Sequence, residues 1–255
     1  KLVHASMIDG IRLSSAKYLR YRHNDLAHLQ QLLTQYHADD NYERIIVVTE
    51  SIFSMDGDET DLAALVALKQ HFAKVMLYVD EAHAIGVRGQ QGLGCAEQYG
   101  VIDAIDFLVG TFGKAVASVG GYLICDPIIR DYLINRMRPL IFSTAQPPIC
   151  MAWTQFMLNQ IVHMQAQRQH LAALSQSIQQ GIQAKGFACP STSQIVPVII
   201  GDSTATVSKA RQLQTAGFYV MPVRPPTVPQ GSSRLRICLN TQFETADLTQ
   251  LLDLL

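Results

Sequence analysis

Short apolar runs recur along the first half of the chain, and each stops at a polar or glycine residue. The runs Arg44–Thr49, Val75–Val79 and Ile105–Val109 are followed by Glu50, by Asp80 and by Gly110-Thr111. Runs of this length, separated by segments of helical period, are typical of buried parallel strands in an α/β sheet. Ligands of such sheets collect at the carboxyl ends of the strands. The pattern therefore predicts that these polar residues face one crevice.

The pattern changes along the chain, and it predicts three parts. Residues 1–148 carry the apolar runs and form the large α/β domain. Residues 149–186 have a long, Gln-rich helical pattern, in which we expect Trp153 to be buried. Residues 187–255 alternate short strand and helix patterns, which predicts a smaller α+β domain.

The residue types at two of the strand ends suit one particular cofactor. Enzymes that use pyridoxal 5'-phosphate need a lysine amine for the cofactor aldehyde and an acidic group for its pyridine nitrogen. Lys114 and Asp80 supply these groups, and Gly113 leaves room for a close approach of the backbone. Thr111 is placed to bond the phosphate, and His83 is placed to contact the ring hydroxyl. Once freed, the Lys114 amine can serve as a general base.

Three other motifs are incomplete. The glycines of Gly86–Gly94 lack the Gly-x-Gly-x-x-Gly spacing of a dinucleotide site. In 110–115 a Walker A loop would need Ser or Thr where Ala115 stands. Asp80-Glu-Ala-His83 has the letters of a helicase box, but no phosphate loop precedes it, and the formal net charge is only −1. This balance argues against nucleic acid as a partner.

Composition bounds the remaining classes. The chain has 255 residues, of which 48% are hydrophobic, so it can bury a sizeable core. The five cysteines are scattered without a Cys-x-x-Cys pair, which is typical of reduced thiols and predicts neither disulfides nor a metal site. No apolar run approaches the ~18 residues that span a membrane. From the sequence we expect a cytoplasmic protein.

Several motifs together resemble the α-oxoamine synthases. These are Val48–Asp58, Asp80-Glu-Ala-His83, Thr111-Phe-Gly-Lys114 and Phe142-Ser-Thr144. The resemblance implies the fold of fold-type I pyridoxal-phosphate enzymes, with Ser118–Cys125 as a strand that runs against its neighbours. It also implies that an amino acid is joined to an acyl thioester with loss of carbon dioxide.

The same resemblance assigns roles to further residues. His4 is similar to the histidine that stacks on the pyridine ring, and it is a candidate donor to the oxyanion of acyl transfer. The segment from Glu50 to Ser54 lines the site. The segment that carries Thr144 reaches across a dimer interface towards the neighbour's phosphate, so we expect a homodimer.

The loop Val223–Arg236 is the best indication of the substrate. Its Arg224-Pro-Pro-Thr227-Val-Pro stretch resembles the family members that condense L-alanine with pimeloyl-CoA or a pimeloyl-carrier protein. The planar fork of Arg224 suits the amino-acid carboxylate, and Thr227 is expected near the thioester. Arg234 and Arg236 follow in a strand. We expect at most one of them to face the site and treat both as structural.

Two alternatives stay open from the sequence. One is another α-oxoamine synthase that uses glycine or serine and a different acyl-CoA. The other is a non-catalytic remnant of the fold. The second arises because the chain begins abruptly at Lys1-Leu-Val-His4, where the family carries roughly a hundred further residues, about a small domain. We therefore expect that an N-terminal part is missing.

Overall fold

The computed structural model describes residues 2–255, which divide into two compact units. The first unit comprises residues 2–52 and Thr60–Gln165, and the second comprises Phe53–Glu59 and Ala166–Leu255. The short segment 53–59 is thus joined at both ends to the first unit but packs within the second. The predicted division into 1–148, 149–186 and 187–255 stays a prediction.

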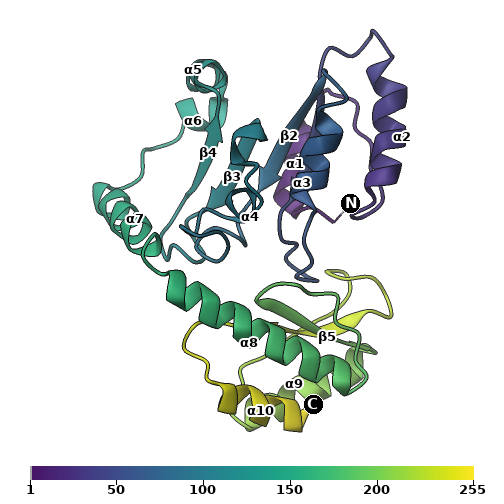
Figure 1. Ribbon diagram of the computed structural model, residues 1–255, viewed down its shortest axis with the longest axis vertical. Coiled ribbons are helices and arrows are strands. Elements are labelled where there is room, and N and C mark those ends of the chain that lie inside the picture. The colour runs from purple at the N-terminus through teal and green to yellow at the C-terminus, as the bar shows by residue number, and fades with distance from the viewer. Residues whose placement is uncertain (1) are drawn as a thin grey trace. The chain divides into compact units, whose positions relative to one another are not determined.

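The first unit is built on a four-stranded sheet of order β1-β2-β3-β4 (Figure 1). Its strands are β1 (Ile45–Glu50), β2 (Val75–Asp80), β3 (Phe107–Thr111) and β4 (Gly121–Cys125). β1, β2 and β3 are parallel, whereas β4 runs antiparallel to β3. Both the parallel strands and the reversed strand were predicted, and both are confirmed.

Helices precede, connect and follow these strands along the chain. They are α1 (Ala5–Leu13), α2 (Leu26–His37), α3 (Leu62–Lys69), α4 (Cys95–Gln98), the 3-10 turn η1 (Ile102–Ala104), α5 (Pro127–Arg136), α6 (Arg138–Ile141) and α7 (Pro148–Ile161). Aspartates cap several of them: Asp25 accepts from the amide of His28, and Asp61 accepts from that of Ala64, each at 2.8 Å. Such caps satisfy amides that the first helical turn leaves without partners.

The second unit contains a three-stranded antiparallel sheet of order β5-β7-β6 (Figure 1). Its elements are α8 (Gln165–Ala184), β5 (Ile195–Gly201), α9 (Ser203–Thr215), β6 (Met221–Val223), β7 (Ser233–Cys238) and α10 (Thr245–Leu254). β7 is the central strand, and Leu235 on it is fully buried. This arrangement is the α+β pattern that the sequence predicts for this part of the chain.

Two expectations about the helical region are wrong. The continuous helix expected over 149–186 is two helices, α7 and α8, separated at residues 162–164. The separation lies beside the boundary between the two units. Trp153 is not buried: it is 46% exposed, and its indole nitrogen donates to the carbonyl of Ala117 at 2.8 Å. An indole needs a partner for its N–H, and this bond supplies one at the surface.

From the packing of the first sheet we predict that truncating two aliphatic side chains has different effects on stability. Leu77 on β2 is fully buried, whereas Ile46 on the neighbouring β1 is 53% exposed. Leu77→Ala should lower the free energy of unfolding by about 2–5 kcal/mol, because it leaves a cavity between packed strands. Ile46→Ala should cost less than about 1 kcal/mol. Urea unfolding of both variants measures the difference, and equal costs would contradict this packing.

Candidate active site

The register of the parallel strands brings the predicted acidic residues together. Glu50 on β1 pairs with Asp80 on β2, and Asp80 pairs with Val109 on β3. Two backbone bonds continue the ladder beyond the strands: the Ser51 amide donates to the Asp80 carbonyl at 2.9 Å, and the Glu81 amide donates to the Val109 carbonyl at 2.7 Å. The strand ends are therefore fixed relative to one another by main-chain bonds.

Asp80 lies in the middle of this edge. Burial raises the pKa of its carboxyl, and the amide of Ala82, the charge of Lys114 and that of His4 act in the opposite direction. Lys114 and His4 are thus close enough to Asp80 to act on its charge. All three predicted residues belong to the first unit and come from different elements, and the charges of Lys114 and His4 act on Asp80.

The two oxygens of the Asp80 carboxylate differ in their hydrogen bonds. Its Oδ1 accepts from the Ala82 amide at 2.8 Å, and its Oδ2 accepts no hydrogen bond from residues 2–255 that the structure records. A half-buried carboxylate of this kind favours an N–H donor that carries positive charge. The protonated nitrogen of a pyridine ring is such a donor, so Asp80 fits the cofactor that the sequence predicts.

Thr111 and Lys114 belong to the turn between β3 and β4. The hydroxyl of Thr111 donates to the Gly120 carbonyl and accepts from the Gly113 amide, both at 3.1 Å. A Cβ at Gly113 would meet its nearest atoms only at 3.4 Å or beyond, so the backbone there is open. Lys114 itself is exposed. The turn therefore presents an amine and a hydroxyl within one short stretch.

His4 has a structural role besides any chemical one. It is the N-cap residue of α1, and its Nδ1 accepts from the Ser6 amide at 3.3 Å and lies 2.8 Å from the Ser6 hydroxyl. The imidazole is exposed and held near the helix start. His83, just past β2, is half-buried, and Glu50 is 3% exposed.

Glu81 is a residue that the sequence reasoning missed. Its carboxylate is fully buried and accepts from the Ser51 hydroxyl at 2.5 Å, the Cys95 amide at 3.1 Å and the Ala96 amide at 2.7 Å. Burial raises the pKa of Glu81, and these three donors lower it in part. The side chain thereby joins the end of β1 to the start of α4. No local pattern distinguishes it from a solvated glutamate.

Tyr122 on β4 is a second missed residue. Its hydroxyl is buried without a hydrogen-bond partner in the described part of the chain. Burial raises the pKa of this phenol strongly, and the charges of Glu81 and Asp80 act in the same direction. A Cβ at Gly110 would lie 2.5 Å from the Tyr122 oxygen. Gly110 is therefore required where β3 and the tyrosine meet.

The remaining predicted residues belong to other segments of the chain. Ser54 belongs to the segment that packs in the second unit, and Thr144 is exposed between α6 and α7. Arg224 lines a hollow of about 320 Å³ in the second unit, together with Ser203, Thr204, Val207, Ser208 and Arg211. Thr227 is exposed, and its amide donates to the Arg224 carbonyl at 3.1 Å. Their roles in binding stay predictions.

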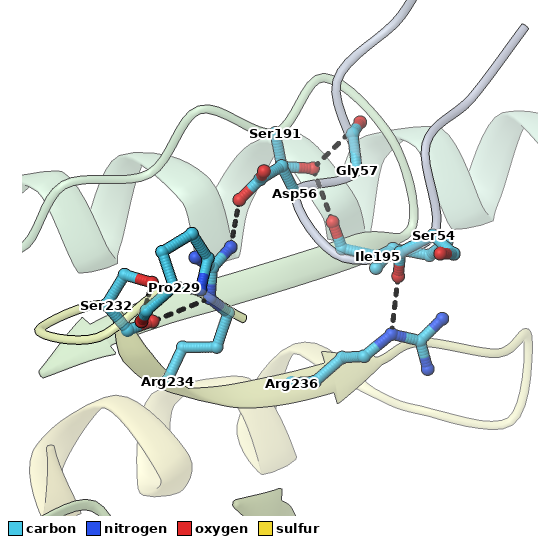
Figure 2. A network of polar contacts seen from close by, with 9 residues as sticks. All are labelled: Ser54, Asp56, Gly57, Ser191, Ile195, Pro229, Ser232, Arg234 and Arg236. Carbon is cyan, nitrogen blue, oxygen red and sulfur yellow. Dashed lines mark hydrogen bonds and ion pairs between the residues drawn. The ribbon is translucent and has the colours of Figure 1, made fainter. Parts of the chain in front are cut away.

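The expectation about Arg234 and Arg236 is wrong in one respect. Residues two apart on a strand project from the same face, so the spacing does not restrict that face to one of them. Both guanidinium groups bind the same segment: Arg234 pairs with Asp56, and Arg236 Nε donates to the Ser54 carbonyl at 2.7 Å (Figure 2).

Comparison with known proteins identifies the class. The family described as Aminotransferase class I and II matches residues 1–255. The chain belongs to this family, and its fold is that of the fold-type I pyridoxal-phosphate transferases. A serine palmitoyltransferase of Sphingomonas wittichii has a TM-score of 0.91 and 32% sequence identity, over 99% of this chain and 63% of that one.

The similarity in sequence is higher to a particular enzyme of this class. The chain is 59% identical over 251 residues to a putative 8-amino-7-oxononanoate synthase of Pasteurella multocida, and 53% identical over 256 residues to an 8-amino-7-oxononanoate synthase of Haemophilus ducreyi. It spans 64% and 66% of these relatives. A crystal structure of 8-amino-7-oxononanoate synthase from Francisella tularensis has a TM-score of 0.85 and 28% identity, over the whole of this chain and 72% of that one.

Two absences apply to residues 2–255. Within this range no helix combines the length and apolar character that crossing a bilayer requires. No group of three His, Cys, Asp or Glu side chains in the same range is placed to hold a metal ion.

The raised pKa of Asp80 predicts a pH dependence of stability. A carboxyl whose pKa is higher in the folded state than its ordinary value of 3.8 stabilises the fold below that pH, and this contribution is lost as the pH rises through the folded pKa. Asp80→Asn removes the buried charge. In cofactor-free protein it should raise stability at neutral pH and flatten the decrease in stability that the parent shows as the pH rises above 3.8.

Urea unfolding at several pH values measures this effect. Asp9→Asn is the control, because Asp9 is exposed on α1. It should leave the pH dependence as in the parent protein. An Asp80→Asn profile that is as steep as that of the parent would contradict the assigned burial.

The three donors on Glu81 give another prediction. In Glu81→Gln the amide NH₂ must face at least one backbone or hydroxyl donor, whichever way the group is turned, and one buried donor is left unsatisfied. The free energy of unfolding should fall by about 1–3 kcal/mol. Glu43→Gln, at an exposed position, should have almost no effect in the same urea experiment. Equal stability of the two variants would refute the role of Glu81.

Proposed function

We propose that this chain binds pyridoxal 5'-phosphate at the carboxyl ends of β2 and β3. The support is the register that aligns Glu50, Asp80 and Val109 at one sheet edge, the effect of the Lys114 and His4 charges on Asp80, and the Asp80 oxygen that accepts no recorded hydrogen bond from residues 2–255. When bound, the cofactor supplies an electron sink for a carbanion at the carbon next to the amino group. The serine palmitoyltransferase structures titled "SPT with PLP" have 30% identity and a TM-score of 0.91 to this chain, which supports the same cofactor here.

The residues at the site have separate tasks in this proposal. Asp80 would hold the proton on the pyridine nitrogen, and the Lys114 amine would attach the cofactor and later serve as the general base for the substrate proton. His4 would contact the ring and donate to the oxyanion of acyl transfer. The other proposed cofactor contacts are made by Glu50, Ser54, His83, Thr111 and, from a second copy, Thr144.

We further propose that the reaction is the decarboxylative condensation of L-alanine with pimeloyl-CoA or a pimeloyl-carrier protein. The product would be 8-amino-7-oxononanoate, a step of biotin biosynthesis. The observation that carries this choice is the 59% identity over 251 residues to a putative 8-amino-7-oxononanoate synthase. Arg224 would bind the amino-acid carboxylate, and Thr227 would lie near the thioester.

A homodimer is part of this proposal. Apolar side chains near Thr144 are exposed: Phe142 is 71% exposed and Ile149 is 75% exposed. Patches of this kind favour burial against another protein surface. A second copy that covers them would bring its Thr144 to the cofactor phosphate. We propose a cytoplasmic location for the enzyme, with 1–148, 149–186 and 187–255 as its domains.

The alternative within the class is a synthase that uses serine or glycine with another acyl-CoA. The structural similarity to the Sphingomonas wittichii serine palmitoyltransferase favours it, but at 32% identity. This value is well below the 59% identity to the alanine-using candidate. A comparison of amino-acid and acyl-thioester substrates by experiment decides between the two synthases.

The test compares substrates and two lysine variants of the intact protein. Alanine, glycine and serine are each paired with pimeloyl, acetyl and palmitoyl thioesters, and product is identified by mass. Alanine with the pimeloyl thioester should give the highest kcat/KM. Lys114→Ala should lower kcat at least ~10²-fold through loss of the base, whereas Lys185→Ala, at an exposed position on the chain, should not.

The outcomes distinguish three hypotheses: the alanine-using synthase, the alternative synthase and a non-catalytic remnant. Preference for serine or glycine would favour the alternative synthase. No product from any pair, together with no pyridoxyl label fixed on Lys114 by borohydride, would favour a non-catalytic remnant. A label on a lysine other than Lys114 would overturn the site assignment itself.

A further inference from the structure

The segment 53–59, which we call the strap, leaves the first unit after Ile52 and returns to it at Thr60. Between these points it forms a closed loop of its own. The Gly57 amide donates to the Phe53 carbonyl, and the Phe53 amide donates to the Asp58 carbonyl, both at 2.9 Å. The strap is therefore a defined structure and not a loose connection.

At Gly57 the backbone of the strap contacts the segment 191–195 of the second unit. Gly57 has φ of +67°, and a Cβ there would lie 1.9 Å from the Ile195 carbonyl oxygen and 2.6 Å from Ser191 Oγ. The Gly57 carbonyl accepts from the Thr192 amide at 3.1 Å, and Ser191 Oγ lies 3.4 Å from the same oxygen (Figure 2). Only glycine permits this approach of two backbones.

A buried ion pair holds the next residue of the strap. The guanidinium of Arg234 pairs with the carboxylate of Asp56, and the two side chains are only 6% and 24% exposed. Arg234 Nε also donates to the Ser232 carbonyl at 3.1 Å (Figure 2). Because β7 is the central strand of its sheet, the base of the arginine is fixed. A buried guanidinium that loses its carboxylate is left as an uncompensated charge.

We propose that Arg234 is a positioning residue, whose ion pair with Asp56 fixes the strap to the second unit and thereby sets the position of Ser54. Arg236 acts beside it through the Ser54 carbonyl. Both ends of the strap are covalently joined to residues of the first unit, Ile52 and Thr60. The expected effect of the ion pair on catalysis rests on the proposed function. Its effect on how firmly the strap is held does not.

The test removes the charge of Asp56 and leaves the arginine in place. Asp56→Asn is compared with Asp131→Asn, which breaks the exposed pair of Arg130 and Asp131, with side chains 68% and 69% exposed. Hydrogen exchange of the intact protein is followed at the amides of Phe53 and Gly57. Asp56→Asn should accelerate their exchange at least tenfold while β5 and β7 stay protected, and Asp131→Asn should change nothing.

A second variant tests whether the two residues act as a pair. In the double variant D56N/R234Q the exchange of the strap should be no faster than in R234Q alone. Unchanged protection of the strap in D56N would overturn the proposal. Equal acceleration in β5, β7 and the strap would also overturn it, because the ion pair would then support the fold of the second unit as a whole.

The catalytic consequence has its own readout. In Asp56→Asn, kcat/KM should fall at least tenfold while the pyridoxyl label on Lys114 still forms, whereas Asp131→Asn keeps both. If the parent protein takes no label on Lys114, the proposed function fails and the exchange experiment still decides the role of the strap. If the label forms and kcat/KM of D56N equals that of the parent, Arg234 does not position the site.

Discussion

The in-register ends of three parallel strands are the constraint on which the candidate site depends. Glu50, Asp80 and Val109 are neighbours across β1, β2 and β3, and main-chain bonds extend the ladder one residue further. Side chains at these positions are therefore placed by the sheet, whose bonds are cooperative and buried, and not by flexible loops. A site for a planar cofactor needs groups that keep their spacing, and a sheet edge provides them.

Two adjacent carboxylates at this edge differ in how many hydrogen-bond donors surround them. Glu81 is fully buried, and its oxygens accept from one hydroxyl and two amides, so it serves to join β1 to α4. Asp80 accepts from one amide and keeps an oxygen for another donor. Alternation along the strand end sends consecutive side chains in different directions. One carboxylate thus stabilises the scaffold while its neighbour stays available for chemistry.

The sequence could predict what depends on local pattern. Apolar runs ending at Asp80 and before Thr111 defined the strands, and the residue types there indicated Lys114 as the amine for the cofactor. The family resemblance added His4, and in the structure the charges of Lys114 and His4 both act on Asp80. Contacts between distant residues left no such signal. Arg234 and Asp56 are separated by 178 positions, and the partners of Glu81 lie on a turn and a short helix. The break between α7 and α8 is also invisible, because no glycine or proline marks 162–164.

The strap shows why a motif is not a list of catalytic residues. Val48–Asp58 as a whole resembles a family motif, but the resemblance places only its Glu50–Ser54 part along the substrate site. In the structure, Gly57 has a steric reason to be glycine, and Asp56 has an electrostatic reason to be acidic. Neither reason involves a ligand. The identity of these two residues follows from how the segment is held.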